Sequence, residues 1–503
     1  MILSISKLSY SYNGSSMPAI TEVSATFSEG WTGIVGNNGS GKSTLLRLAC
    51  GELVPDAGSI MPRPAGAYCA QSTERAPRNL EDFALDYSPD AAQLRATLDL
   101  DDEWPWRFET LSPGERKRLQ IACALWQMPP VLALDEPTNH LDAPTRHLLL
   151  GALKAYRGVG LLVSHDRLFI DELAYQCCFL DEGSATVIPG GYNQAKSQQD
   201  LNRKTMASEH RRAHEEVLRV TAERARRRTE ADRAASRRSA RHLDKGDRDG
   251  RARIRLAVVS GQDGKAGLLS AQMGKKMEDA RERLTRAPVK KVYDGPLELH
   301  ARPAGRKVLV REPAGCLSLE EGRTLRYPAV TLGNRDRVGL RGCNGVGKST
   351  FLNHLLADSS EDRGVIWIPQ EMDSAGGRAV LEDLKSLSQG ERGRALSIVA
   401  RLNSSPGRVL AGDELSPGEL RKVLLACGLL REPYLIVMDE PTNHLDIHSI
   451  EALQDVLGSC DCALVLVSHD EQFLDALTDT TWAFEEKSGM RGRGDVELTV
   501  SLR

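Results

Sequence analysis

Short runs of apolar residues alternate with helix-like stretches in each half of the chain. Residues 32–36 and 337–342 predict buried strands that lead into a helix, and residues 131–135 and 435–439 are apolar up to a terminal aspartate. Strands that are apolar along their whole length are typical of parallel sheets covered on both faces. The pattern therefore predicts an α/β fold with a doubly wound sheet in each half.

The middle of the chain follows a different pattern. Residues 194–241 are polar, rich in Ala, Arg and Glu, and free of Gly and Pro, which predicts one helix of about 70 Å at about 1.5 Å per residue. Residues 242–250 contain two glycines and predict a turn, and residues 251–286 predict a returning helix weakened by further glycines. The alternative is a disordered charged linker. Aliphatic residues near the turn, such as Ile254 and Val258, favour the helical hairpin.

The two halves also repeat one another in sequence. GNNGSGKST (36–44) recurs as GCNGVGKST (342–350), and VLALDEPTNHLD (131–142) recurs as LIVMDEPTNHLD (435–446). From the lysine of the first motif to the first aspartate of the second there are 93 residues in one half and 91 in the other. Repeats of this length are whole domains rather than solenoid units. We expect a first domain at 1–192, an interdomain hairpin at 193–294 and a second domain at 295–503.

Composition narrows the class of protein. Of the 503 residues 41% are hydrophobic, but no run of 18 apolar residues occurs, and the first residues lack the layout of a signal peptide. We therefore expect a cytoplasmic protein without a membrane domain. The ten cysteines form no C-x-x-C pair, so we expect small buried hydrophobes in a reducing compartment rather than a metal site.

Charge is distributed unevenly. Residues 193–292 carry 27 Lys and Arg against 14 Asp and Glu, and contain no aromatic residue, whereas the whole chain has a net charge of −3. A segment of +13 suits a polyphosphate partner. The lack of aromatic residues argues against stacking on single-stranded bases, so recognition would be by backbone and shape.

Each half contains the pattern G-x-x-x-x-G-K-[ST], after a predicted strand and before a predicted helix. Glycines let the backbone N–H groups wrap phosphates, the lysine reaches the β- and γ-phosphates, and the serine ligates Mg²⁺. The sequence therefore predicts two ATP sites with Mg²⁺. The residues expected to bind ATP here are Gly36, Asn37, Asn38, Gly39, Ser40, Gly41, Lys42, Ser43 and Thr44, and Gly342, Cys343, Asn344, Gly345, Val346, Gly347, Lys348, Ser349 and Thr350.

Further candidates follow the apolar runs. Asp135 and Asp439 end a strand, where a carboxylate can hold Mg²⁺ together with Ser43 and Ser349. The next residue, Glu136 or Glu440, can orient and deprotonate the attacking water. His165 and His469 lie 30 residues beyond the aspartates in both halves, which predicts a γ-phosphate contact. Gln71 and Gln370 end short strand-like runs and are expected to link metal or water to the neighbouring subdomain.

The motif LSPGE occurs at 111–115 and 415–419, 23 residues before each aspartate when counted from its serine. Ser suits a helix N-cap, Pro suits the first helical position, and the exposed amides there favour an anion. Ser112 and Gly114, and Ser416 and Gly418, can therefore complete a phosphate site that the P-loop of the same half does not reach, although a capped helix start alone is also a common structural feature. LSQGE (387–391) lies 51 residues before Asp439, so we assign it to a turn of the helical subdomain.

Together these motifs resemble the ABC ATPase superfamily, and the tandem EPTNHLD and LSPGE motifs resemble its ABC-F family. The resemblance implies two P-loop ABC domains that pair within one chain, as a monomer, so that each composite site joins one P-loop to the LSPGE motif of the other half. It also implies binding to the ribosome at the tRNA exit site. There, the hairpin would reach ribosomal RNA, the P-site tRNA and the peptidyl-transferase centre.

This chain departs from the family pattern in several places. Tyr12, or Tyr10 in its place, is expected under the adenine of the first site, whereas Leu319 or Glu320 stands there in the second. Only 41 residues separate Gln71 from Ser112, so we expect no inserted arm. With no basic tail expected after the second domain, the layout resembles the antibiotic-resistance branch of the family.

The expected function is a ribosome-bound ATPase that modulates translation, either as a housekeeping factor or as a protein that protects against drugs at the peptidyl-transferase centre. The tandem ATPase subunit of an importer and a DNA-repair or chromatin ATPase are alternatives, and the basic hairpin between two complete domains argues against both. The candidate RNA contacts are Arg224, Arg226, Arg227, Arg228, Lys245 and Arg248.

Overall fold

The computed structural model describes the chain apart from residues 15–16, 64, 140, 182, 239–261, 287–300, 320–321, 358–363, 371, 412–414, 488–494 and 503. The chain forms two compact units, one of Met1–Ala195 with Tyr293–Arg503 and the other of Lys196–Val292. We call the two halves of the first unit the first and second cassette.

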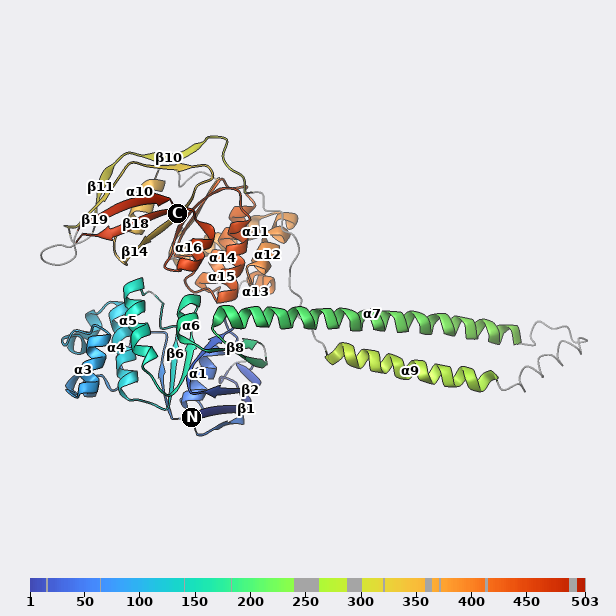
Figure 1. The fold of residues 1–503 in the computed structure, drawn as a ribbon. Coiled ribbons are helices and arrows are strands. Elements are labelled where there is room, and N and C mark those ends of the chain that lie inside the picture. The colour runs from blue at the N-terminus through green and yellow to red at the C-terminus, as the bar shows by residue number, and fades with distance from the viewer. Residues whose placement is uncertain are drawn as a thin grey trace, which may run out of the picture. The chain divides into compact units, whose positions relative to one another are not determined.

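The first cassette is built on a six-stranded sheet and a three-stranded antiparallel sheet (Figure 1). Its strands are β1 (Ile2–Tyr10), β2 (Ile20–Ser28), β3 (Gly30–Val35), β4 (Ala57–Met61), β5 (Gly66–Cys69), β6 (Val131–Asp135), β7 (Val159–Val163), β8 (Gln176–Asp181) and β9 (Ser184–Pro189). The larger sheet has the order β5-β6-β7-β3-β8-β9, parallel except for the β8–β9 pair. Its helices are α1 (Lys42–Cys50), α2 (Leu80–Leu85), α3 (Pro89–Thr97), the 3₁₀ helix η1 (Trp104–Thr110), α4 (Pro113–Trp126), α5 (Ala143–Lys154) and α6 (Arg167–Leu173).

The second cassette repeats the core of this sheet. Its strands are β10 (Val308–Glu312), β11 (Gly315–Ser318), β12 (Thr324–Tyr327), β13 (Val330–Gly333), β14 (Arg337–Gly342), β15 (Val365–Ile368), β16 (Leu435–Asp439), β17 (Ala463–Val467), β18 (Thr480–Glu486) and β19 (Val496–Leu502). The eight-stranded sheet has the order β11-β12-β19-β18-β14-β17-β16-β15, in which β15-β16-β17-β14-β18 matches β5-β6-β7-β3-β8. Its helices are α10 (Lys348–Leu356), α11 (Ser374–Ser386), α12 (Gln389–Arg401), α13 (Pro406–Ala411), α14 (Pro417–Leu429), α15 (Ile447–Gly458) and α16 (Glu471–Leu477).

The central strands confirm the prediction of a parallel α/β core. Every residue of β6, β7, β16 and β17 is buried, as expected for strands that are covered on both faces. Strand β7 lies between β6 and β3, and β17 lies between β16 and β14. Because parallel strands end at the same edge, the P-loop and the strand-end aspartate of each cassette come together there with the VSHD motif (163–166 or 467–470), which we call the histidine segment.

The described part of the second compact unit consists of two helices. Helix α7 (Tyr192–Arg238) begins in the first unit and continues into the second, and α9 (Gln262–Arg286) follows. This confirms the long helix over its described part. The predicted turn at 242–250, with Lys245 and Arg248, and residues 251–261 lie outside the described residues.

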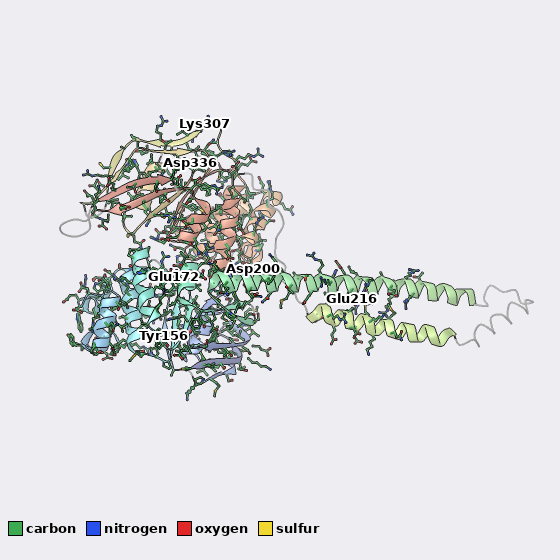
Figure 2. The ribbon with its side chains drawn as sticks, in the orientation of Figure 1. Tyr156, Glu172, Asp200, Glu216, Lys307 and Asp336 are labelled. Carbon is green, nitrogen blue, oxygen red and sulfur yellow. The ribbon has the colours of Figure 1, made fainter. Side chains whose placement is uncertain are left out.

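Helices α7 and α9 pack against each other in antiparallel directions. Arg283 lies 3.2 Å from Glu216, which projects from α7 (Figure 2), and Thr221 lies 3.6 Å from the sulfur of Met277. Val220, Met273 and Met277 form a small apolar cluster between the helices. Arg224, Arg226 and Arg227 are exposed on α7 and Arg227 pairs with Glu223, whereas the side chain of Arg228 lies outside the described residues.

Candidate ATP sites

The first P-loop is shaped by glycines at positions that exclude a side chain. Gly41 has φ +91°, and a Cβ there would lie 2.5 Å from the carbonyl oxygen of Ala19. Lys42 opens α1, and its Nζ donates to the carbonyl oxygens of Gly36 at 2.8 Å and Asn37 at 3.0 Å. Burial lowers the pKa of Lys42, with the carboxylate of Glu136 acting in the opposite sense. The loop therefore holds a buried cation where phosphates are expected.

The second P-loop has the same construction. Gly347 has φ +92°, and Lys348 Nζ donates to the carbonyl oxygens of Gly342 at 2.7 Å and Cys343 at 2.9 Å. A Cβ on Gly347 would lie 2.6 Å from the side chain of Leu319. Leu319 thus packs against the second P-loop, while Glu320 lies outside the described residues.

The two strand-end aspartates are buried beside the P-loop serines. Ser349 Oγ donates to Asp439 Oδ2 at 2.5 Å, and burial raises the pKa of Asp439. At Asp135 burial also raises the pKa, against hydrogen bonds from Ser43 and Tyr68. A hydroxyl next to a carboxylate is a donor set that suits Mg²⁺, which prefers oxygen ligands and takes further ones from water and phosphate.

Each aspartate is followed by a glutamate that faces the predicted histidine. Glu136 Oε1 lies 2.9 Å from His165 Nε2, and Glu440 Oε1 lies 3.4 Å from His469 Nε2. Both glutamates have φ +48°, a conformation rarely adopted by residues other than glycine and one that clusters at functional sites. Burial raises the pKa of Glu440 to about 7. The structure therefore brings the predicted carboxylate and histidine together in both cassettes.

A cavity of about 420 Å³ opens at the first P-loop. It is lined by Tyr12, Ala19, Asn38, Gly39, Gly41, Lys42, Ser43, Thr44, Gln71, Asp135, Glu136, Asn139, Val163, His165 and His444. All but His444 belong to the first cassette. The phenol of Tyr12 lies 3.2 Å from Thr44 Oγ1, and Tyr10 packs edge-on against Tyr12 with ring centroids 5.1 Å apart. The cavity therefore collects the residues predicted for the first site, with Tyr12 rather than Tyr10 in its lining.

The end of the EPTNHLD motif in the second cassette contacts the first P-loop. The backbone N–H of Asn38 donates to Asp446 Oδ2 at 2.8 Å, and its side chain donates to the carbonyl oxygen of His444 at 3.1 Å. Burial raises the pKa of Asp446, but the Asn38 N–H and Ser449 outweigh it and hold the pKa below its usual range.

The LSPGE residues of the second cassette are connected to the first P-loop through His444. Ser416 and Gly418 do not line the cavity, but a Cβ on Gly418 would lie 3.1 Å from the carbonyl oxygen of His444. Because His444 also accepts from Asn38, the start of α14 is connected to the opposite P-loop through one residue. The first cassette also acts on the second P-loop. There, burial and then the carboxylate of Asp142 raise the pKa of Cys343.

Three serine-initiated helices share one capping arrangement. Ser112, Ser416 and Ser388 each accept from the backbone N–H of the glutamate three residues later, which in turn accepts from the serine backbone N–H. LSQGE, predicted as a turn of the helical subdomain, includes the turn after α11 and also the first residues of α12, where it forms the same capping box. Helix capping alone therefore does not distinguish LSPGE from LSQGE, whereas position in the fold does.

The second site differs from the first in several contacts. His469 Nε2 lies 2.8 Å from Oδ1 of Asn344, whose counterpart Asn38 bonds across to the other cassette. Gln370 is exposed two residues beyond the end of β15. Trp367 occupies the position of Tyr68, whose hydroxyl donates to Asp135 Oδ2 at 2.8 Å.

Sequence reasoning missed several of these residues. His444 and Asp446 lie inside the repeated EPTNHLD motif, so the repeat itself was the signal for them. Lys117 was not predicted because a lysine on a helix such as α4 usually faces solvent. Here it is 3% exposed and donates to the carbonyl oxygens of Ala70 at 2.7 Å and Gln71 at 3.0 Å, and burial lowers its pKa to about 8.

The expectation that the cysteines are buried needs one correction. All ten are free, and eight are buried, but Cys316 and Cys343 are exposed. Cys343 belongs to the P-loop, which must face its ligand, and Cys316 lies on the short antiparallel strand β11. Within the described residues no group of three or more His, Cys, Asp or Glu could hold a metal ion. No helix among them is long and apolar enough to cross a membrane.

Comparison with known proteins agrees with this geometry. The family model "ABC transporter" matches residues 20–139 and 325–443. The archaeal recycling factor aABCE1, in a crystal structure with a ribosomal stalk protein, aligns with a TM-score of 0.61 at 18% identity, over 98% of this chain and 89% of its own. The chain is therefore a tandem ABC ATPase that binds and hydrolyses ATP.

Relatives define the family more closely. The tylosin resistance ATP-binding protein TlrC of Streptomyces fradiae is 32% identical, over 91% of this chain and 93% of its own length. The ATP-binding protein Uup of Caulobacter vibrioides is 30% identical (91% and 73%), and the ribosome protection protein VmlR of Bacillus subtilis is 28% identical (93% and 84%). The chain belongs to the ABC-F family.

Proposed function

We propose that this protein binds the ribosome in its ATP-bound state, modulates translation there and is released by ATP hydrolysis. The observation that carries the proposal is the pairing of α7 with α9 in a unit rich in arginine, in a chain that resembles a ribosome protection protein over 93% of its length. Protection against drugs at the peptidyl-transferase centre is the specific form that the relatives VmlR and TlrC favour.

The proposed chemistry assigns a role to each residue type at the two sites. The P-loops bind the phosphates of ATP; Ser43 with Asp135, and Ser349 with Asp439, would hold Mg²⁺, which would supply neutralisation of phosphate charge. Glu136 and Glu440 orient and deprotonate the attacking water, and their burial keeps bulk water from competing. His165 and His469 contact the γ-phosphate, while Gln71 and Gln370 link metal or water to the neighbouring subdomain.

The proposed division of labour follows the chain. The first cassette (1–192) and the second (295–503) form both ATP sites as a monomer, and the hairpin (193–294) contacts ribosomal RNA and the P-site tRNA. With 27 Lys and Arg in residues 193–292, phosphate contacts would supply most of its affinity. No catalytic candidate lies in that segment, so its effect on translation is separable from ATP hydrolysis.

The test is co-sedimentation of the Glu136→Gln, Glu440→Gln protein with ribosomes in the presence of ATP. Loss of both bases should slow hydrolysis by about 10²–10⁴ and trap the protein on ribosomes. The wild type with ADP is the control and should stay in the supernatant. If the trapped protein does not sediment with ribosomes, the proposal fails and the ATPase subunit of an importer becomes the better assignment.

A parallel translation assay separates the two forms of the proposal. Ribosomes inhibited by a drug of the peptidyl-transferase centre should regain activity when the wild-type protein and ATP are added. Stimulation of translation without drug, together with no recovery of drug-inhibited ribosomes, would indicate a housekeeping factor instead of a protective one.

A further inference from the structure

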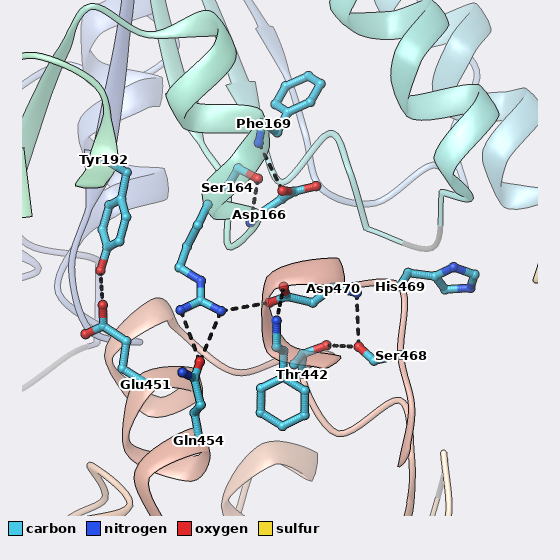
Figure 3. Close-up of polar contacts among 12 residues, drawn as sticks. Ser164, Asp166, Phe169, Tyr192, Thr442, Glu451, Gln454, Ser468, His469 and Asp470 are labelled. Carbon is cyan, nitrogen blue, oxygen red and sulfur yellow. Dashed lines mark hydrogen bonds and ion pairs between the residues drawn. The ribbon is translucent and has the colours of Figure 1, made fainter. Parts of the chain in front are cut away.

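Two arginines of the first cassette contact the histidine segment of the second. Arg146, on α5, donates from Nη2 to the carbonyl oxygen of His469 at 3.0 Å, and its Nη1 lies 2.8 Å from Asp166 Oδ2. Arg167, at the start of α6, lies 3.5 Å from Asp470 Oδ2 and 3.4 Å from Gln454 Oε1 (Figure 3). Two successive residues of the second cassette are thus held by side chains of the first.

The segment they hold is also fixed within its own cassette, where the backbone N–H of Asp470 donates to Ser468 Oγ at 3.1 Å. Ser468 Oγ lies 3.1 Å from Thr442 Oγ1, and Asp470 Oδ1 accepts from the backbone N–H of Phe473 at the start of α16 (Figure 3). Between them, His469 directs its ring toward the second site, 2.8 Å from Asn344 Oδ1 and 3.4 Å from Glu440 Oε1. The peptide carbonyl that Arg146 holds belongs to the same residue as this ring, so a shift of that peptide moves the ring.

The arrangement is one-sided. The positions that match Arg146 and Arg167 in the second cassette are Ile450 and Glu471, by alignment of the repeated EPTNHLD and VSHD motifs. Ile450 is buried and apolar, and Glu471 is exposed and carries the opposite charge. Neither can donate to a carbonyl oxygen of the first histidine segment, so the repeat does not supply the return contact.

We propose that Arg146 and Arg167 are positioning residues for ATP hydrolysis at the second site, which thereby depends on contact with the first cassette. A displacement of about 1 Å in a group beside the reacting atoms can cost up to about 10²-fold in rate. The dependence concerns the chemical step more than binding, because Lys348 and the P-loop backbone lie in the second cassette itself. This inference rests on the ATPase activity and not on the ribosome.

The experiment measures one site at a time in the full chain. On the Glu136→Gln background, where the second site turns over, Arg146→Ile with Arg167→Met should lower kcat about tenfold, with KM for ATP within twofold. Arg146→Ile installs the residue of the equivalent position in the other cassette. Arg146→Lys, which keeps a charged donor, should recover kcat to within about threefold of the parent.

Two controls separate positioning from general damage to the interface. Tyr192 Oη donates to Glu451 Oε1 at 2.6 Å, on the same helix as Gln454, so Tyr192→Phe weakens this interface without touching the histidine segment. It should leave second-site kcat within twofold. On the Glu440→Gln background, Arg167→Met should likewise leave first-site kcat within twofold, since the guanidinium contacts Gln454 and Asp470 of the second cassette.

An unchanged second-site kcat in the double arginine variant would overturn the proposal, and so would an equal fall at both sites or a change confined to KM. Thermal unfolding of each variant identifies one that fails to fold. In that case Gln454→Leu, which removes a partner of Arg167 from the other side, replaces it and should lower second-site kcat about threefold.

Discussion

At the scale of single residues, the aspartates that end β6 and β16, which are the proposed Mg²⁺ ligands, are supported differently. Asp135 and Asp439 each accept from the P-loop serine, but Asp135 also accepts from the hydroxyl of Tyr68, whereas Trp367 stands at the matching position in the second cassette. Outer partners of a metal-binding carboxylate fix its orientation and tune its affinity. The repeated motifs are nearly identical at both sites, so this difference lies outside them and is visible only in the folded chain.

Tyr68→Phe should raise the Mg²⁺ concentration for half-maximal hydrolysis at the first site about tenfold, because Asp135 loses the group that orients it. The measurement is ATPase activity against Mg²⁺ on the Glu440→Gln background. Tyr156→Phe is the matched control, since it removes a hydroxyl bonded to the carbonyl oxygen of Pro129 at 2.8 Å, away from the site. Equal Mg²⁺ dependence in both variants would show that Tyr68 does not support the metal.

Lys117 should make stability depend on pH. Burial lowers its pKa from 10.5 to about 8 in the folded chain. Between about pH 8 and 10.5 the unfolded chain therefore holds a proton that the folded chain has released, and the free energy of unfolding rises with pH. Below pH 8 both states are protonated and the cost of burying the charge is present in full.

The thermal midpoint of wild type minus that of Lys117→Met should accordingly grow between pH 7.5 and pH 9.5, because methionine cannot titrate. Near pH 7 the variant still loses the bonds to the carbonyl oxygens of Ala70 and Gln71, a cost of about 1–3 kcal/mol. A difference that stays constant with pH would show that Lys117 keeps its proton throughout.

At the scale of elements, periodicity predicted most of the structure. The apolar runs at 131–135 and 435–439 became β6 and β16 with the expected ends, since nothing competes with a parallel strand in a run that must be buried. The LSPGE helices also began at the predicted serine. What periodicity could not supply was the contact across the interface, because Asp446 reaches Asn38 only once the two sheets have folded and paired.

The start of helix α4 supplies a test of the composite sites. Ser112→Arg should impair hydrolysis at the site that carries Lys348 and spare the site that carries Lys42, because a bulky cation would occupy the helix N-terminus offered to the opposite nucleotide. The expected loss at the Lys348 site is about tenfold or more in ATP affinity or turnover. Single-site backgrounds, Glu136→Gln for the second site and Glu440→Gln for the first, report the two separately.

Ser388→Arg is the control for this prediction, since Ser388 caps α12 with the same capping box and belongs to LSQGE. It should cost a similar amount of helix stability, about 1 kcal/mol, while leaving turnover at both sites within twofold. Damage by Ser112→Arg confined to the Lys42 site would rule out the head-to-tail pairing of the cassettes.

At the scale of the whole molecule, composition was the strongest guide. The second compact unit, Lys196–Val292, lies within the basic, aromatic-free part of the sequence, because a two-helix pair needs few apolar residues. Val220, Met273 and Met277 supply its apolar contact, and no motif identified them. The one-sided arginine contacts were likewise beyond prediction, because a repeat encourages the expectation of symmetry.

The last prediction concerns the charge of α7. Reversing Arg224, Arg226, Arg227 and Arg228 to glutamate should weaken binding of the ATP-trapped protein to ribosomes and flatten its salt dependence. Each lost phosphate contact reduces the slope of log affinity against log salt by about 1. Only those arginines that face RNA contribute, so the reduction should be smaller than four contacts would give.

Co-sedimentation across a salt series measures both quantities, with a control of similar net charge. Arg335, Arg408 and Arg431 lie in the second cassette with side chains 66%, 65% and 52% exposed, and reversing them changes overall charge without touching the hairpin. This control should keep the wild-type slope, and ATPase activity without ribosomes should survive both sets of changes. Equal slopes in the two variants would show that α7 docks by something other than phosphate contacts, since long-range attraction alone would respond to net charge wherever it lies.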